Sequence, residues 1–197
     1  MSDLVVIDDY INVPPVFLPE GSEEPFKYCK VCNKELLENN ERYVIEKAYS
    51  QDLEKKSRKL IFEFAYCADC LEQIREEFSL ESKKKIDDFF NTNTNLEKRY
   101  QGLKKCKLFD VDIWLHNCIV KNKSIDKVKE FQIMALCQGN DMLFYQAPYM
   151  ICGEAMDDLM GLLSNKTLDI INDFWADIID LPPELEDIFK TKKPVIF

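Results

Sequence analysis

The sequence has few of the residues on which most enzyme sites depend. His116 is the single histidine, so any Cys–His dyad would have to use that side chain. Only five glycines occur in 197 residues, which leaves no room for a phosphate-binding glycine loop. The sequence therefore names no catalytic residue, and we expect the protein not to be an enzyme; an enzyme of unrecognised class is the third choice.

The chain also lacks an excess of positive charge. It contains 26 lysines and arginines against 36 aspartates and glutamates, which gives a formal net charge of −10. A molecule of this charge repels phosphate backbones unless a local basic patch outweighs the global field. The basic runs are short, and we interpret them as loop tips and solvated helix faces. A nucleic-acid-binding zinc-finger regulator is therefore the second choice.

Long apolar runs are missing as well. No stretch approaches the roughly 18 apolar residues that a membrane helix requires. Residues 1–15 include no basic leader, and the apolar run at 4–7 is too short for the core of a signal peptide. We therefore expect a cytoplasmic protein without a membrane partner. Because that compartment is reducing, its eight cysteines favour metal ligation or buried thiols over disulfides.

The residues that are present predict a folded α+β protein. Apolar residues make up 46% of the chain, which is ample for a packed core. The proline-bearing segment 1–27 predicts an extended arm that begins with a short strand at 4–8. Residues 41–50 and 60–66 have the alternation and the β-branched and aromatic content of two strands of a hairpin. From Ala68 the period becomes helical, and Ser82 is the expected cap of a further helix.

The second half of the chain repeats the order of the first. A shift of 82 positions aligns Cys70 with Cys152 and Ser82 with Ser164, the expected cap of the last long helix. Eight of the 28 positions in residues 60–87 are identical at this shift, whereas composition alone gives roughly two. The sequence thus predicts an internal duplication, with coincidence as the alternative. The expected parts are the arm at 1–27, one unit at 28–95 and a related unit at 96–197, with "NTNTN" at 91–95 as the linker.

Four cysteines form two C-x2-C pairs, Cys29 with Cys32 and Cys67 with Cys70, and 34 residues separate the inner members. A two-residue gap lets both sulfurs of a pair point into one tetrahedron, and zinc is the ion expected with thiolate ligands. A redox pair and buried unligated thiols are the alternatives. A redox pair needs one C-x2-C within a parallel βαβ pattern, which the sequence does not contain. We expect one structural Zn²⁺ in a closed site, because four protein ligands leave no position for water.

The order of elements around these cysteines resembles the treble-clef class of zinc fingers. A knuckle, a β-hairpin and a second cysteine pair in the first turn of a helix span about residues 27–78. The resemblance implies that Cys29, Cys32, Cys67 and Cys70 are the metal ligands. Treble-clef nucleases of the His-Asn-His type carry histidines at the hairpin and helix, and this sequence has none there.

The second unit has lost part of the pattern. The 82-residue shift aligns Cys152 with Cys70 and puts Tyr149 at the position of Cys67. Upstream, where the second hairpin loop is shorter, Cys118 falls where Cys32 would be and Leu115 occupies the remaining ligand position. Two sulfurs do not complete a structural zinc tetrahedron, and His116 is more simply a surface or core polar residue than a third ligand. We expect a metal-free unit in which Cys118 and Cys152 lie close together as buried thiols.

An acidic stripe marks the last helix. Asp169, Asp173 and Asp177 recur every four residues, and more acidic residues follow at Asp180, Glu184, Glu186 and Asp187. Like charges at this spacing repel, so the stripe is either a docking surface or an ordinary solvated face opposite apolar residues. Together these features predict a zinc-stabilised protein-interaction module, namely an adaptor, inhibitor or regulator whose acidic surface engages a basic protein partner.

Overall fold

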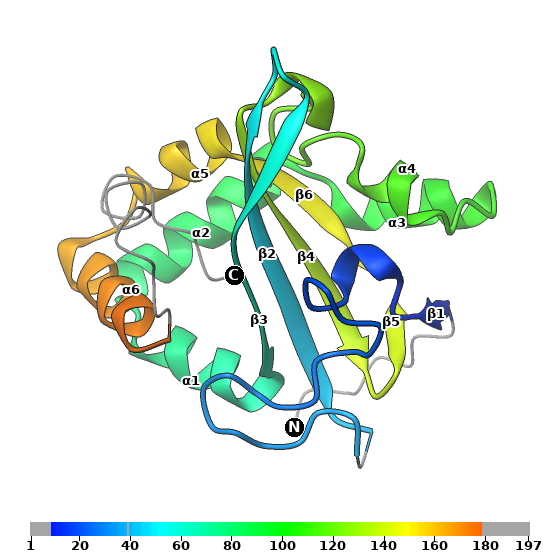
Figure 1. Cartoon of the computed structure of the whole chain (residues 1–197). Helices are drawn as coiled ribbons and strands as arrows, with labels where there is room; N and C mark the ends of the chain where they lie inside the picture. The colour runs from blue at the N-terminus through cyan, green and yellow to red at the C-terminus, as the bar shows by residue number, and fades with distance from the viewer. Residues whose placement is uncertain (1–8, 39, 179–197) are drawn as a thin grey trace.

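The computed structural model describes residues 9–38 and 40–178 and has a mixed α+β architecture (Figure 1). The strands are β1 (Tyr10–Asn12), β2 (Arg42–Asp52), β3 (Ser57–Cys67), β4 (Glu130–Gln138), β5 (Asp141–Leu143) and β6 (Tyr149–Cys152). The α-helices are α1 (Ala68–Glu77), α2 (Leu80–Asn93), α3 (Leu96–Lys105), α4 (Val111–Leu115), α5 (Gly153–Met160) and α6 (Asn165–Ile178). Short 3-10 helices occupy Pro15–Phe17 and Ile125–Lys127. Among the described residues, no helix combines the length and the apolar character needed to cross a bilayer.

The strands of the described residues form one antiparallel sheet with the order β1-β5-β4-β2-β3, and β6 also pairs with β4. The long strands β2 and β4 pair at its centre, where Glu46 lies opposite Met134. On the outer side of β2, Tyr43 pairs with Cys67 at the end of β3. On the outer side of β4, Phe131 pairs with Cys152 at the end of β6. Each central strand therefore carries a partner that leads through a cysteine into a helix.

Other segments pack on both faces of the sheet. On one face, the Trp175 ring of α6 lies with its centroid 5.1 Å from the rings of both Phe62 and Phe64. On the other face, the N-terminal arm crosses in front of the sheet in Figure 1. Lys47 anchors the arm, because its Nζ donates to the Leu18 carbonyl at 2.7 Å and forms a 2.8 Å ion pair with the Glu63 carboxylate.

The sequence predicted β2, β3 and the start of α1 correctly, but it placed one helix start a turn too late. Ser79, not Ser82, caps α2, and its Oγ accepts the Ser82 N–H at 3.1 Å. Ser164 does stand at the start of α6, where its Oγ accepts the Thr167 N–H at 3.4 Å. Helix α3 was not anticipated, and the strand expected at 4–8 lies outside the described residues.

Two short strands, rather than one long strand, follow β4. Strand β5 pairs with the end of β4, and β6 pairs with its beginning. Pro148 lies between them and has no N–H to donate to a neighbouring strand, which explains why the pairing stops before it. The second hairpin is therefore less regular than the continuous β2–β3 hairpin.

The starts of α2 and α6 meet in a cluster of hydroxyl groups. The Ser79 N–H donates to Thr167 Oγ1 at 3.1 Å, and the Ser164 N–H donates to Ser82 Oγ at 2.9 Å. The hydroxyls of Ser79 and Ser164 lie 2.9 Å apart. At the start of each helix, a backbone N–H group therefore donates to a hydroxyl group from the other helix.

Candidate metal centre

The first cysteine pair lies on a tight knuckle between Tyr28 and Glu35, which form an isolated antiparallel bridge. Within it the Cys29 N–H donates to the Lys34 carbonyl at 2.8 Å, and the Asn33 N–H donates to the Cys29 carbonyl at 2.9 Å. Asn33 has a φ of 59°, a left-handed conformation that asparagine tolerates better than most residues. The turn brings both sulfurs of the pair to the same side.

The second pair stands at the junction of β3 and α1. Cys67 is the N-cap of α1, and Cys70 is the third residue of that helix. The Lys30 N–H donates to the Ala65 carbonyl at 2.8 Å and joins the knuckle to β3. The Cys67 N–H donates to the Cys29 sulfur at 3.3 Å. Strand, knuckle and helix thus fix the four side chains relative to one another.

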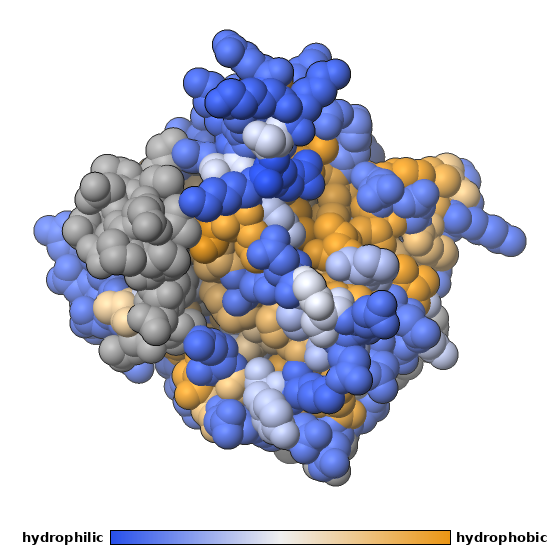
Figure 2. All heavy atoms as spheres, viewed as in Figure 1, coloured by the Kyte–Doolittle hydropathy of each residue, from blue (hydrophilic) through white to orange (hydrophobic). Residues whose placement is uncertain are grey.

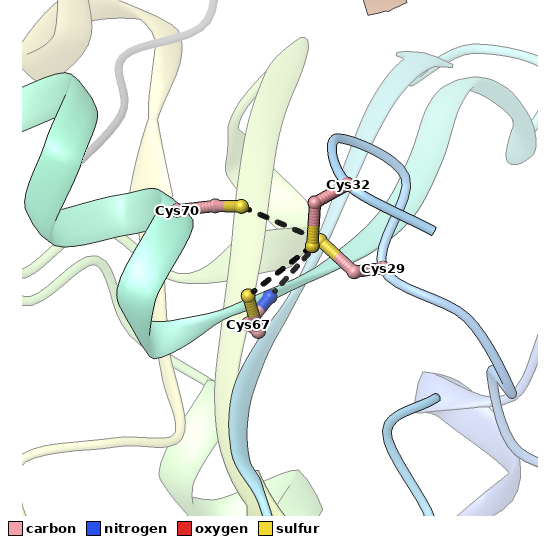
Figure 3. A group of neighbouring side chains, drawn as sticks. All are labelled: Cys29, Cys32, Cys67 and Cys70. Carbon is pink, nitrogen blue, oxygen red and sulfur yellow. Dashed lines mark hydrogen bonds between the residues drawn. The ribbon is translucent and has the colours of Figure 1, made fainter. Parts of the chain in front are cut away.

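The four sulfurs point toward one another, as Figure 3 shows. The Sγ atoms of Cys29 and Cys70 lie 3.8 Å apart, as do those of Cys32 and Cys67, and all four lie within 4.8 Å of one another. Tetrahedral zinc with Zn–S bonds of about 2.3 Å separates its sulfur ligands by about 3.8 Å. The cluster therefore fits a metal ion such as zinc. Among the described residues, no other group of three or more cysteine, histidine or acidic side chains has this proximity.

Hydrogen bonding distinguishes the thiols. Burial acts to raise the pKa of Cys29, but the backbone N–H groups of Cys32 and Cys67 donate to its sulfur and bring that pKa below its ordinary value. Burial raises the pKa of Cys67 and, more strongly, that of Cys70. Because an incoming metal must displace these protons, its binding is expected to strengthen as pH rises.

The knuckle is also tied to the helix by charge. The Lys34 ammonium lies 2.9 Å from a Glu41 carboxylate oxygen and 3.2 Å from one of Asp69 in the first turn of α1. The cysteines themselves differ in exposure, since Cys32 is exposed and the other three are buried. A bound ion would therefore be reached from solvent along the Cys32 side.

The remaining cysteine pair, Cys118 and Cys152, is buried and in contact, as expected, but its alignment with the first pair needs correction. The Cys152 N–H donates to the Cys118 sulfur at 3.3 Å, the same contact and distance as from Cys67 to Cys29. Cys152 also caps its helix as Cys67 does. In these contacts Cys118 matches Cys29 rather than Cys32, and Cys152 matches Cys67 rather than Cys70.

The expected ligand positions Leu115 and Tyr149 are wrong for the same reason. The residues that stand where the other two ligands would be are Lys121, three residues after Cys118, and Ala155, the third residue of α5. A shift of 85 residues, three more than 82, aligns the start of α5 at Gly153 with the start of α1 at Ala68. Three residues are close to one helical turn, so such an error keeps apolar residues on the same face and escapes notice in the sequence.

The structure does not bring His116 and Cys118 together as a dyad. His116 is exposed and lines a hollow of about 210 Å³ together with Val16, Phe131 and Ile133. The Cys118 sulfur instead accepts N–H groups from Lys121 and Cys152. Of the other two cysteines, Cys106 is exposed, whereas Cys137 is buried and its pKa is raised by that burial.

Sequence reasoning missed a buried carboxyl group at the centre of the sheet. Glu46 is fully buried, and its carboxylate accepts hydrogen bonds from the Tyr66 hydroxyl and, at 2.8 Å, from Gln132 Nε2. Burial raises its pKa to about 8, although both hydrogen bonds act to lower it. The only signal in the sequence was a glutamate among the apolar residues of β2.

The acidic stripe faces solvent where the structure describes it. Asp169 and Asp173 are exposed on α6, while Ile171 and Trp175 are buried on its opposite face. The side chain of Asp177 and all of residues 180–187 lie outside the described residues.

In comparisons with known proteins, no protein-family model, no curated protein and no solved structure matches this chain.

Proposed function

We propose that Cys29, Cys32, Cys67 and Cys70 hold one zinc ion whose role is structural. The observation that supports this most directly is the pair of 3.8 Å sulfur–sulfur distances, which equal the edge of a zinc–thiolate tetrahedron. Four protein ligands leave no open position for a substrate or an activated water, so the ion stabilises the fold rather than catalysing a reaction. The order of knuckle, hairpin and helix around these cysteines supports our proposal of a treble-clef-like unit.

We further propose that the chain is an internal duplication of this unit. Supporting features are the equivalent pairing of Tyr43 with Cys67 and of Phe131 with Cys152, and the shared N-cap role of the two cysteines. An approximate two-fold axis passes between β2 and β4 at Glu46 and Met134, which lie opposite each other. The reciprocal hydroxyl contacts at the starts of α2 and α6 follow the same symmetry.

Its role, on this proposal, is protein interaction in the cytoplasm, as an adaptor, inhibitor or regulator that engages a basic partner. The net charge of −10 supports this, because it attracts cationic proteins and repels nucleic acids. A second feature is an apolar hollow. Figure 2 shows hydrophobic residues gathered in the middle of one face, over β4 and β6. A hollow lined by Leu115, Ile125 and Phe131 also has Asp112, Asp126 and Arg58 in its wall. The Arg58 guanidinium lies 4.7 Å from the Phe131 ring centroid, so two carboxylates and one guanidinium surround the apolar floor and leave a net negative charge that favours a cationic side chain.

A binding titration tests this role against the nucleic-acid alternative. A lysine-rich peptide containing leucine and a single-stranded DNA are titrated separately at about 50 and 200 mM salt. The proposal expects the peptide to bind and the DNA not to bind. The double variant Asp112→Asn, Asp126→Asn should weaken peptide binding more than Asp169→Asn, Asp173→Asn, which removes the same charge from α6. DNA binding with a steep salt dependence would establish the nucleic-acid alternative. Unchanged peptide affinity in both variants would show that these acidic residues do not bind the peptide.

A further inference from the structure

The knuckle that contains Cys118 has the same backbone hydrogen bonds as the knuckle that contains Cys29 and Cys32. Its Cys118 N–H donates to the Lys123 carbonyl at 2.8 Å, and its Asn122 N–H donates to the Cys118 carbonyl at 2.8 Å. In the first knuckle the bonds from Cys29 and Asn33 have the same pattern at 2.8 and 2.9 Å. The two turn asparagines have φ angles of 59° and 53°. This backbone is the one that positions two ligands in the first unit.

The second knuckle is also attached to its sheet in the same way. The Ile119 N–H donates to the Met150 carbonyl at 3.0 Å, as the Lys30 N–H does to Ala65 at 2.8 Å. Asn117 and Ser124 form the isolated antiparallel bridge that closes the turn, which matches the bridge between Tyr28 and Glu35. The knuckle, the strand end and the helix start therefore have the same mutual arrangement in both units.

The N–H groups that surround the first sulfur are preserved too. Cys118 accepts from Cys152 at 3.3 Å and from Lys121 at 3.4 Å, the residues that correspond to Cys67 and Cys32. In metal sites such donors stabilise the negative charge of a thiolate. Nothing in a purely apolar packing role requires a sulfur to be surrounded by backbone donors. These bonds are the feature of the second unit that points to a metal ligand.

We propose, on the basis of the duplication proposed above, that the second knuckle is a zinc site that lacks only two ligands, at positions 121 and 155. Ala155 is fully buried at the third position of α5, where Cys70 stands in α1. Lys121 is exposed, as Cys32 is, and its ammonium pairs with Asp158. A cysteine at either position would therefore have the same burial class as its counterpart in the first site.

The two substitutions that would complete the ligand set should disturb the fold little. Ala155→Cys adds one sulfur atom at a helix start, and Lys121→Cys removes an ion pair whose partner Asp158 is more than half exposed. Exposed pairs of this kind contribute little to stability. Zinc binding at the completed site involves no redox change: four thiols release their protons to the buffer, and their sulfurs donate electron pairs to the ion.

The test is the double variant Lys121→Cys, Ala155→Cys, with zinc per chain measured by elemental analysis. We expect it to bind one ion more than the unsubstituted protein. The matched control is Lys123→Cys, Ala155→Cys, which adds the same number of thiols and also removes an exposed lysine–carboxylate pair, that of Lys123 with Glu154. This control should bind no additional ion, because residue 123 lies beyond the turn.

Cobalt(II) provides a second readout, since tetrahedral thiolate coordination gives it an intense charge-transfer absorption. The double variant should show about twice the absorption of the unsubstituted protein at saturation, and its Tm should rise on addition of zinc. Equal zinc content in the double variant and the unsubstituted protein would overturn the proposal, as would equal gains in the variant and its control, or a variant that does not fold in excess zinc. The count for the unsubstituted protein tests the first site separately, so failure of one proposal is distinguishable from failure of the other.

Discussion

At the scale of single residues, two cysteines with matched surroundings should differ sharply in importance. Cys67 and Cys152 are both 1% exposed, both cap a helix, and both donate their N–H to a cysteine sulfur at 3.3 Å. Only Cys67 belongs to the four-cysteine cluster that we propose binds zinc. Structural zinc contributes on the order of 10 kcal/mol to small domains, whereas replacing a buried thiol costs roughly 1–3 kcal/mol.

We therefore expect Cys67→Ser to abolish zinc binding and to lower the Tm far more than Cys152→Ser, which should retain zinc. Thermal unfolding followed by circular dichroism, together with the zinc content of both variants, provides the comparison. Equal destabilisation by the two substitutions would show that the metal does not account for the difference.

Because the pKa of Glu46 is raised, this residue should make the folded protein less stable as pH increases. Its pKa rises from 4.5 to about 8 on folding, so between these values the folded protein holds one proton more than the unfolded chain. The contribution of Glu46 to the free energy of unfolding is therefore fully present below about pH 4.5 and is lost as the pH rises to about 8. Over this range the free energy of unfolding falls by at most about 1.4 kcal/mol per pH unit. Glu46→Gln is neutral at every pH and should flatten this dependence.

Urea unfolding of both proteins at pH 5, 6, 7 and 8 measures the effect. The difference in unfolding free energy, variant minus unsubstituted protein, should increase steadily across this range. A constant difference would mean that Glu46 ionises alike in both states.

The residues of the candidate metal site were predictable, whereas Glu46 was not. The spacing of Cys29, Cys32, Cys67 and Cys70 depends on local turn geometry, which the sequence records directly. The burial of Glu46 depends on β4 pairing along β2 and on Tyr66 and Gln132 reaching the carboxylate. Because those partners lie on other strands, no local sequence pattern predicts them.

At the scale of elements, the starts of α2 and α6 should be energetically coupled. Ser82 Oγ accepts the Ser164 N–H at 2.9 Å and also lies 3.1 Å from Ser164 Oγ. We expect Ser82→Ala and Ser164→Ala each to cost about 1 kcal/mol, with a coupling of at least about 0.5 kcal/mol in a double-mutant cycle.

A control pair sets the baseline for this cycle. Ser124 caps the short 3-10 helix through the Asp126 N–H and makes no hydrogen bond with either serine. Ser124→Ala combined with Ser82→Ala should therefore be additive. Additivity in the Ser82–Ser164 pair as well would contradict the close packing of the two helix starts.

Regular elements were easier to predict than their exact ends. The alternation in β2 and β3 and the change of period at Ala68 are strong local signals, and the structure confirms them. The cap of α2 was misplaced because Ser79 and Ser82 are both good capping residues, and only the contact with α6 gives them different roles. Helix α3 has a short apolar face and follows a polar turn, so its sequence does not separate it from the preceding loop.

At the scale of the whole molecule, one sheet joins the two proposed units, yet they should respond differently to loss of metal. A strong chelator should remove hydrogen-exchange protection from residues 28–36 and from α1 first. The corresponding parts of the second unit, residues 117–124 and α5, should keep most of theirs, because they form the same backbone bonds without a complete ligand set. Equal loss of protection in both units would show that the sheet makes them a single cooperative body with respect to the metal.

X-ray absorption at the zinc edge of the purified protein, together with elemental analysis, measures whether the four cysteines form a closed zinc centre. We expect about one zinc per chain, surrounded by four sulfur atoms at about 2.3 Å with no oxygen or nitrogen ligand. A protein without bound metal, or a zinc ion with fewer than four sulfurs, would contradict the account.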